Sequence, residues 1–490
     1  MKFDLKKFFS DKHHVFLVLI LLLAFLIRLQ FYDVNTGFWW DESEYLNMGK
    51  YFSKSLEMNL NAQRPLLFPL LIAGGYLLGL DVVGIRFLTV LIPSLLTVLF
   101  VYLLGKEMYD QKTGLIAASM MSLYWLLLFN TARVHSDPLG LMFNAGMLYF
   151  FWRGWVKERS TKYLVLAGIF GGAGFMTRIA ALLVPIIILI YVLITERTKI
   201  LKYKKQVLAS VIVAFLVVIP YLLWVKKTFG SYFAFSSGYT NAGEGLPAAW
   251  NILSFIGPQY MGMGFFWFMI LGLAVTLFYF IIGFDIFWKG RDDKLKSDFM
   301  IILFVLMQVG YFIFIQRAAE DRWLMPAMIG LFILSARGVM TIYNPIQKWN
   351  KAMGVLFIIL ILALGGYWHY KQADTIIDAR KDSEANVQLA GQWMAERTNP
   401  GDVIMSSNVH MELLHASERK IQSFGSDENE TISLIKETRP KYLMMSLYYR
   451  SEDWHYQFPE KHADKLKLAK MYEENGQPTL WIFEVDADAF

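Results

Sequence analysis

Directly after its first long apolar segment the chain reads Phe38-Trp39-Trp40-Asp41-Glu42-Ser43-Glu44-Tyr45. Tryptophans are enriched where a chain leaves a bilayer, and a carboxylate this close to hydrocarbon costs desolvation energy unless it has a partner or a task. The two adjacent acids are therefore candidate site residues. A plainer interpretation is the start of a surface helix, with Asp41 or Ser43 as its cap and the other acids favoured in its first turn.

Composition defines the class of protein. Of the 490 residues, 56% are hydrophobic, and runs of about 20 apolar residues recur as far as Tyr370, which predicts a polytopic α-helical membrane protein. Residues 1–370 carry 33 Lys and Arg against 20 Asp and Glu, whereas residues 371–490 carry 14 against 21. We therefore expect two domains, a basic transmembrane domain over 1–370 and an acidic soluble α/β domain over 371–490. The basic charge follows membrane topology, so we expect no nucleic-acid partner, and the absence of cysteine excludes disulfides.

The predicted topology follows from the charges that flank the apolar runs. Lysines before the first run predict a retained span with the N-terminus in the cytoplasm of a plasma membrane. The short run 66–80 follows Arg64-Pro65 and contains Pro69 and three glycines. If it crossed, the basic connections would face outward, so we expect a juxtamembrane or partly re-entrant helix within an outer loop of about residues 35–82. About eleven spans remain, which places the C-terminal domain outside the cytoplasm.

This topology gathers charged residues in the outer loops: Asp41, Glu42, Glu44, Arg64, Arg133, His135, Asp137, Arg178, Arg317, Glu320, Asp321 and Arg322. Guanidinium groups bind phosphate through paired charge-assisted hydrogen bonds. The cluster therefore suits a ligand with an anionic head and an apolar tail. Each residue also has a structural interpretation, because an arginine beside a span can be a snorkelling anchor and Glu320-Asp321-Arg322 could be a self-neutralising turn.

Several short motifs occur in order along the membrane domain. They are Trp40-Asp41-Glu42 with Tyr45, Gln63-Arg64-Pro65-Leu66-Leu67-Phe68-Pro69-Leu70, the run around Arg86, Arg133-Val134-His135-Ser136-Asp137-Pro138, and Asp321-Arg322-Trp323-Leu324-Met325-Pro326. In order and spacing they resemble the GT-C glycosyltransferases, and most closely the dolichyl-phosphate-mannose protein mannosyltransferases and the aminoarabinose (lipid A) transferases. The resemblance covers residues 1–370, and its general layout extends to the C-terminal domain.

The resemblance implies a function. It implies transfer of a sugar, with inversion, from an undecaprenyl or dolichyl phosphate donor to a hydroxyl of a lipid, glycan or protein outside the cytoplasm. The family's catalytic base falls on Asp41, its other acids on Glu42 and Asp137, and its phosphate contacts on Arg64 and Arg322. We further expect Arg133, Arg178 and Arg317 near the donor phosphate, and substrate contacts from Trp40, Tyr45, His135, Glu244, Glu320 and Asp321.

The chemistry of such a transfer needs a similar set of groups. Breaking a sugar–phosphate bond forms an oxocarbenium-like centre, so a base is needed beside the acceptor oxygen and cations beside the phosphate. Asp41 and Glu42 would point about 100° apart on a helix, so we assign the base to Asp41 and a supporting role to Glu42. A helix N-terminus would lower the pKa of Asp41, so positioning should carry much of the rate.

Some alternatives stay open at this point. His135 and Asp137, with Glu42 or Glu44, could form a metal site, although we expect no obligatory metal. The Gly- and Ser-rich stretch 236–247 suits a mobile lid over a lipid headgroup, and a plain loop explains it equally well. A transporter or flippase for an anionic lipid could use the same arginines, and a lipid-binding sensor could use the C-terminal domain. Against a transporter, the halves show no inverted repeat and the charges collect at one membrane surface.

The C-terminal region has an α/β pattern. We expect helices at about 383–397 and 431–437 and strands at 403–406, 441–447 and 479–485. It has no nucleophile triad, phosphate loop or metal spacing. Asn429-Glu430-Thr431 fits a glycosylation sequon, which is a weak signal. By the resemblance, this domain covers the site and helps to choose the acceptor.

Overall fold

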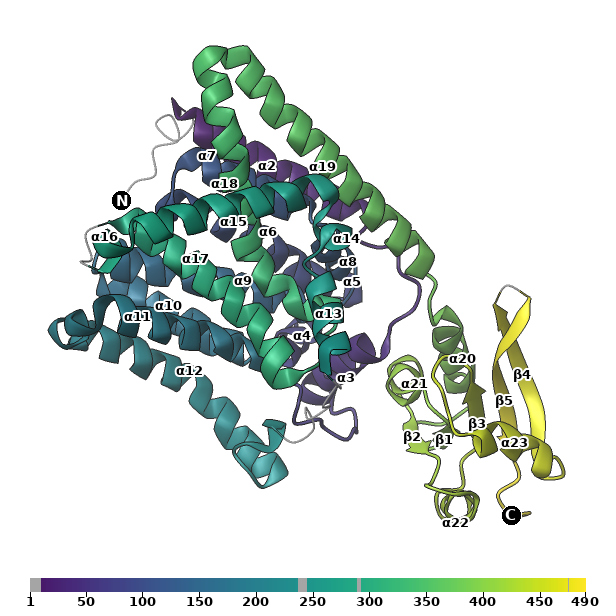
Figure 1. Ribbon diagram of the computed structural model, residues 1–490. Coiled ribbons are helices and arrows are strands. Elements are labelled where there is room, and N and C mark those ends of the chain that lie inside the picture. The colour runs from purple at the N-terminus through teal and green to yellow at the C-terminus, as the bar shows by residue number, and fades with distance from the viewer. Residues whose placement is uncertain (1–9, 237–244, 289–291, 475) are drawn as a thin grey trace.

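The computed structural model describes residues 10–236, 245–288, 292–474 and 476–490. A helical membrane part and a C-terminal α/β domain are joined by one long helix, α19 (Lys351–Arg380) (Figure 1). The domain boundary expected near residue 370 falls inside this helix. Its continuous apolar run ends at Tyr370, and Lys371 begins an end in which charged and apolar residues alternate.

The membrane part is built from helices packed around one large apolar core. Several begin at an aspartate whose side chain accepts a backbone N–H of the first turn, as Asp110 does from Thr113 at 2.9 Å. In chain order the elements are α2 (Lys12–Gln30), α3 (Trp40–Lys54), α4 (Leu67–Leu77), α5 (Val82–Arg86), η1 (Phe87–Leu91), α6 (Ile92–Met108), α7 (Gln111–Leu123), α8 (Trp125–Thr131), α9 (Asp137–Phe151), η2 (Trp152–Lys157), α10 (Thr161–Phe175), η3 (Ile179–Leu182), α11 (Leu183–Lys202), α12 (Lys204–Phe229), η4 (Ala234–Ser236), α13 (Gly245–Ser254), α14 (Pro258–Met261), α15 (Met263–Ile282), α16 (Phe284–Trp288), α17 (Asp293–Gly310), η5 (Tyr311–Gln316), η6 (Asp321–Leu324) and α18 (Met325–Trp349).

Eight of the described helices are long and apolar enough to cross a membrane, or nine if α7 and α8, which meet at 53°, form one broken span. The other two expected spans form α9, which continues without a break into η2, and the 15-residue helix α10. At a rise of 1.5 Å per residue α10 is about 22 Å long, against a hydrocarbon core of about 30 Å. The membrane class is confirmed, whereas the count of eleven spans stays a prediction. The run 66–80 forms the 11-residue helix α4, which is short for a crossing.

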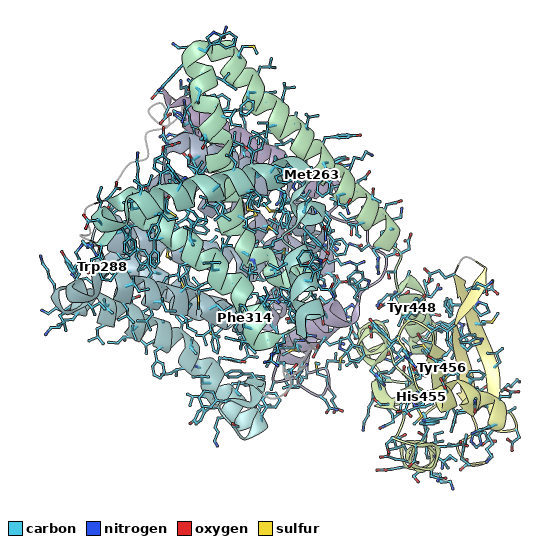
Figure 2. The ribbon with its side chains drawn as sticks, in the orientation of Figure 1. Met263, Trp288, Phe314, Tyr448, His455 and Tyr456 are labelled. Carbon is cyan, nitrogen blue, oxygen red and sulfur yellow. The ribbon has the colours of Figure 1, made fainter. Side chains whose placement is uncertain are left out.

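Large apolar side chains project from the membrane part. Met263, Trp288 and Phe314 are exposed and point outward (Figure 2). Exposed apolar residues in such number fit a surface that faces lipid.

The C-terminal domain is a five-stranded sheet between two pairs of helices. The sheet order is β2-β1-β3-β5-β4, in which β1 is parallel to β2 and β3, and β5 is antiparallel to β3 and β4. Its elements are α20 (Ala385–Ala395), β1 (Val403–Ser406), α21 (His410–Ser417), β2 (Lys420–Ser423), α22 (Glu428–Thr438), β3 (Tyr442–Ser446), α23 (Asp453–Lys461), β4 (Leu466–Glu474) and β5 (Gln477–Val485).

The strands of this sheet place alternate residues on its two faces. Ile404 and Met444 share a core with α20 and α21, whereas Met405 and Leu443 share a core with α22 and α23. This follows from the two-residue period of a strand, and it gives three layers. The expected α/β class is confirmed, with β2, β4, α21 and α23 as additional elements.

The C-terminal domain docks on α3, the helix that carries Asp41. Lys50 pairs with Glu418 at 2.7 Å and donates to the His415 carbonyl at 3.0 Å, and Asn47 donates to the Met411 carbonyl at 2.8 Å. The position of this domain is therefore tied to the helix at the candidate site.

The loop before α3 touches the other domain backbone to backbone. The Thr36 N–H donates to the Lys381 carbonyl at 2.9 Å. A Cβ atom at Gly37 would lie 2.3 Å from the Ser383 carbonyl oxygen, so only glycine allows this approach.

Candidate active site

The stretch Phe38–Tyr45 leads into and begins helix α3. The N-cap is Trp39, whose backbone N–H donates to the Glu42 carboxylate at 3.1 Å. The helix start and the charged site expected from this stretch therefore coincide, although neither Asp41 nor Ser43 is the cap. As expected from their spacing on a helix, Asp41 and Glu42 face different partners.

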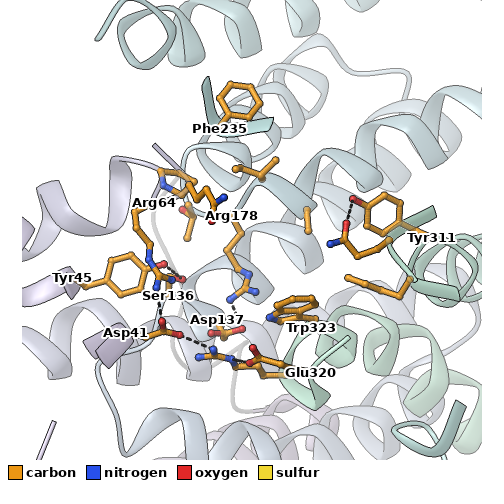
Figure 3. Close-up of a pocket in the computed structure, with 18 residues that line it drawn as sticks. Asp41, Tyr45, Arg64, Ser136, Asp137, Arg178, Phe235, Tyr311, Glu320 and Trp323 are labelled. Carbon is orange, nitrogen blue, oxygen red and sulfur yellow. Dashed lines mark hydrogen bonds and ion pairs between the residues drawn. The ribbon is translucent and has the colours of Figure 1, made fainter. Parts of the chain in front are cut away.

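Asp41 is held between two arginines that are distant in sequence. Arg64, 23 positions away, binds its Oδ1, and Arg322, 281 positions away, binds its Oδ2 at 2.6 Å (Figure 3). Arg64 also donates to Glu44 at 2.6 Å. Burial acts to raise the pKa of Asp41, but Arg64 and Arg322 outweigh it and hold the pKa well below its usual range. Asp41 is therefore ionised and fixed in orientation.

Glu42 and Arg133 form a buried ion pair behind the site. Their exposed fractions are 1% and 0%, and Arg133 Nη1 lies 2.7 Å from Glu42 Oε2. Arg133 also stacks on the Trp39 ring at 3.6 Å and donates to the Arg380 carbonyl at 2.7 Å, at the end of α19. Arg133 thus joins α3 to the C-terminal domain. With no exposed surface, it is not placed to contact a donor phosphate as expected from the sequence.

Asp137 begins α9 and is paired with Arg178. Asp137 is buried, whereas Arg178 keeps about a quarter of its side chain exposed. A Cβ atom at Gly140 would lie 2.9 Å from Cδ of Arg178, so the glycine lets this arginine lie against α9. The pair directs the guanidinium toward a cavity.

That cavity, which we call the arginine cavity, has a volume of about 420 Å³. Arg64, Arg178 and Arg322 line it. Trp323 lies beside Asp137 and Arg178, and Phe235 lies farther along the wall (Figure 3). Its lining is Asp41, Tyr45, Gln63, Arg64, Pro65, Ser136, Asp137, Thr177, Arg178, Ile179, Ala180, Phe235, Tyr311, Phe312, Gln316, Glu320, Arg322 and Trp323. Three cations beside aromatic and apolar walls suit a phosphate that carries an apolar tail.

A second cavity of about 530 Å³ lies between the membrane part and the C-terminal domain. This interdomain cavity is lined by Trp39, Trp40, Asp41, Trp125, Leu126, Phe129, Asn130, His135, Glu320, Asp321, Arg322, Ile376, Arg380, Ser383, Glu384, Tyr448 and Tyr449. Tyr448 lies at the end of the C-terminal domain nearest the membrane part (Figure 2). Asp41, Glu320 and Arg322 line both cavities, so Asp41 stands where the two meet.

The expected substrate contacts divide between the two cavities. The hydroxyl of Tyr45 lies 3.0 Å from Ser136 in the arginine cavity, and the Arg64 guanidinium lies over its ring. Trp40 and His135 line the interdomain cavity. His135 Nδ1 lies 2.9 Å from the Asn130 side chain, and burial, reinforced by Arg322, lowers the pKa of His135 to about 4.

The residues of the outer loop at 317–322 contribute unequally to the two cavities. Glu320 pairs with Arg322 at 2.7 Å, and Asp321 accepts from Tyr260 at 3.5 Å. Arg317 is exposed and is absent from the described residues that line either cavity. Glu244 and most of the expected lid lie outside the described residues.

The side chains considered for a metal site have other partners. Glu42 faces Arg133, His135 faces Asn130 and Asp137 faces Arg178. Across residues 10–236, 245–288, 292–474 and 476–490, no group of three or more His, Asp or Glu side chains could hold a metal ion.

Sequence reasoning missed much of the interdomain cavity. Trp125 lay inside an apolar run, and Tyr448 and Tyr449 followed a strand without any motif. The one available signal was Tyr448-Tyr449-Arg450, a polar aromatic cluster at the end of a buried strand, where loops carry binding residues.

Sequence comparison places this chain near membrane sugar transferases. Residues 63–224 match the family described as dolichyl-phosphate-mannose-protein mannosyltransferase. Over 267 residues the chain is 27% identical to undecaprenyl phosphate-alpha-4-amino-4-deoxy-L-arabinose arabinosyl transferase 2 of Proteus mirabilis (strain HI4320). That match covers 52% of this chain and 45% of the relative, so the chain spans about half the length of the relative it matches.

Structural similarity extends over nearly the whole chain. ArnT from Cupriavidus metallidurans in the apo state superposes with a TM-score of 0.71 at 13% identity, covering 96% of this chain and 98% of ArnT. The chain has the GT-C fold. ArnT bound to undecaprenyl phosphate shares this GT-C fold with a TM-score of 0.70 over 95% and 97% of the two chains. AglB from Archaeoglobus fulgidus, in complex with an inhibitory peptide and a dolichol-phosphate, gives 0.61 at 13% identity over 90% and 70%.

Proposed function

We propose that the protein is an inverting glycosyltransferase at the extracytoplasmic face of the plasma membrane, which uses a polyprenyl-phosphate sugar as its donor. The observation that carries the proposal is the position of Asp41, at the junction of the arginine cavity and the interdomain cavity. The relative from Proteus mirabilis and the matching family support this substrate class, because their names include an undecaprenyl phosphate sugar and dolichyl-phosphate mannose.

The donor occupies the arginine cavity. Arg64, Arg178 and Arg322 bind its phosphate and stabilise the charge that grows on the phosphate as the sugar leaves. The first prenyl units lie along Phe312 and Trp323. The donor phosphate needs no general acid, because it is already a good leaving group.

The acceptor enters through the interdomain cavity. Its hydroxyl meets Asp41, which accepts the proton as the oxygen attacks the sugar carbon on the face opposite the phosphate. Because the acceptor and the donor phosphate lie on opposite sides of the sugar, the configuration at the attacked sugar carbon is inverted. Because the paired arginines weaken Asp41 as a base, fixed orientation of the acceptor contributes much of the rate.

Asp41→Asn tests the proposal. The variant should bind undecaprenyl phosphate as the wild type does, yet lose transfer from undecaprenyl-phosphate-linked aminoarabinose by about a hundredfold to ten-thousandfold. The acceptors are membranes of a strain that lacks the gene. Asp378→Asn, an exposed carboxylate paired with Lys381, is the matched control.

Either of two results would contradict the proposal. If Asp41→Asn transfers sugar at the wild-type rate, Asp41 is not the catalytic base. Lipid movement across the bilayer without any transfer by the wild-type protein favours the carrier function instead. Mass analysis of lipid-linked sugars that accumulate in the deletion strain identifies the donor sugar.

A further inference from the structure

The C-terminal domain places two buried carboxyl groups around one phenol at the interdomain cavity. The Tyr449 hydroxyl lies 2.9 Å from Glu384 Oε1 and 3.0 Å from Glu412 Oε1. Glu384 and Tyr449 line the cavity, whereas Glu412 is fully buried behind them. Tyr449 also packs edge-on against Trp40, the neighbour of Asp41, with ring centroids 6.2 Å apart.

The hydrogen bonds of this cluster require an extra proton. A phenol hydroxyl carries one hydrogen, so Tyr449 can donate to only one of the two carboxyl groups. The other contact is a hydrogen bond only if that carboxyl is itself protonated and donates to the phenol oxygen. Both hydrogen bonds can therefore form only when the two carboxyl groups hold one proton between them, with Tyr449 as the bridge.

Charge and burial agree with this geometry. Burial raises the pKa of Glu384, and burial together with the Glu384 charge raises the pKa of Glu412. The groups that face the cluster are Glu42 of α3, Arg133 before α9, Arg380 of α19, and His410 of α21, whose ring packs on Trp40. A raised pKa means that such a carboxyl keeps its proton to a higher pH than an exposed one.

The other groups at the interdomain cavity are poor resting places for a proton. Asp41 is paired with two arginines, and Glu320 with one. His135 has a pKa lowered to about 4 and is neutral at pH 7. Asp321 is the exception, because burial raises its pKa, although its carboxylate already accepts the backbone N–H of Arg322 at 2.6 Å and the hydroxyl of Tyr260.

We propose that the Glu384–Tyr449–Glu412 cluster receives the proton that the acceptor hydroxyl loses, after its brief stay on Asp41; this rests on the proposed function. In the step, the acceptor O–H bond breaks, a bond forms from that oxygen to the sugar carbon, and the bond from that carbon to phosphate breaks with its electron pair on the phosphate. The resting cluster keeps its shared proton on Glu412, so ionised Glu384 takes the proton from Asp41 through the cavity and releases it to solvent before the next turnover. This restores the ion pairs of Asp41 with Arg64 and Arg322 and readies the base for the next turnover.

Glu384→Gln tests the cluster, because glutamine still accepts the Tyr449 hydrogen bond but cannot take the proton. Since ionised Glu384 is the acceptor, the wild-type rate should rise with pH as Glu384 loses its proton, above the range of ordinary carboxyl groups. The variant should lose this rise of the rate with pH, which we call the acid limb of the pH profile. It should also transfer sugar about tenfold more slowly than the wild type. The probe is undecaprenyl-phosphate-linked aminoarabinose, with membranes of the deletion strain as acceptor.

Three comparisons keep the test decisive. Glu396→Gln, an exposed carboxylate just beyond α20, is the matched control and should keep the wild-type rate and pH profile. Infrared spectra of the purified protein should show, besides protonated Glu412, a second buried carboxyl that titrates above the ordinary range and is missing in Glu384→Gln, a readout independent of activity. Tyr449→Phe removes the hydrogen bond that favours ionised Glu384, so the acid limb should stay but move to higher pH.

A wild-type rate and pH profile in Glu384→Gln would overturn the cluster's role, as would loss of the acid limb in Asp321→Asn alone. Failure of the proposed function is distinguishable, because the wild-type protein itself would then not transfer sugar.

Discussion

The arginine cavity and the interdomain cavity share Asp41, Glu320 and Arg322 but are built differently. The arginine cavity takes all its described walls from the membrane part, and its charged lining is Arg64, Arg178 and Arg322 with their partners Asp41, Asp137 and Glu320. The interdomain cavity adds Glu384, Tyr448 and Tyr449 of the C-terminal domain, and its walls are rich in tryptophan. The described lining of one cavity therefore belongs to the membrane part alone, whereas the other cavity depends on how the C-terminal domain docks.

This difference indicates which parts of the protein can vary independently of each other. Substitutions at the domain interface can reshape the interdomain cavity without moving the cations of the arginine cavity. The proposed donor site can thus stay constant while the proposed acceptor site changes.

The largest effect should follow from removing Glu42, which supports both cavities. Glu42→Ala leaves Arg133 buried without its counter-charge, so the free energy of unfolding should fall by about 3–5 kcal/mol. Chemical denaturation in detergent measures this. Glu107→Ala breaks the half-exposed pair with Arg153 and should cost at most about 1 kcal/mol. Equal losses in the two variants would show that the Glu42–Arg133 pair does not hold the site together.

A smaller effect, confined to the arginine cavity, is expected from Arg178→Lys. Lysine keeps the charge beside Asp137 but cannot offer two parallel donors to a phosphate. The affinity for undecaprenyl phosphate should fall about tenfold, the equivalent of about 1.4 kcal/mol. Arg317→Lys serves as the control, because Arg317 is exposed and lies away from the described lining. Binding to protein in lipid nanodiscs reports both values, and unchanged affinity in Arg178→Lys would remove this residue from the phosphate site.

The smallest effect, confined to the interdomain cavity, is expected from Glu418→Gln. Its pair with Lys50 fastens the C-terminal domain to α3, but 53% of the Glu418 side chain is exposed. The docked state should lose about 0.2–1 kcal/mol, and the loss should shrink as salt rises. Cross-linking yield between the two domains measures docking, while undecaprenyl phosphate affinity should not change. A change in that affinity would contradict the independence of the two cavities.

The sequence predicted the membrane part well because its signals are local. Apolar runs and flanking charges mark helices, and the order of the short outer motifs indicated that Asp41, Arg64 and Arg322 share one site. The structure brings these three together in a chain of ion pairs. The number of spans was less predictable, because the break between α7 and α8 and the shortness of α10 depend on packing.

The roles of individual charges were hard to predict because burial is a property of the fold. In the sequence, Arg133 is a loop arginine like Arg178, yet the structure stacks it under Trp39 with no exposure. Glu384 resembles any surface glutamate between Ser383 and Ala385. Its contact with Tyr449, and through Tyr449 with Glu412, depends on two later segments of the C-terminal domain. No local sequence pattern predicts that contact.

The residue at the position of Gly37 can indicate how closely the two domains approach each other in related proteins. Because a methyl group there would collide with the Ser383 carbonyl, a homologue with alanine or serine at this position must seat its C-terminal domain farther from α3. Its interdomain cavity would then be taller and admit bulkier acceptors. Sorting homologues by the residue at this one position therefore offers a simple way to group them by acceptor size.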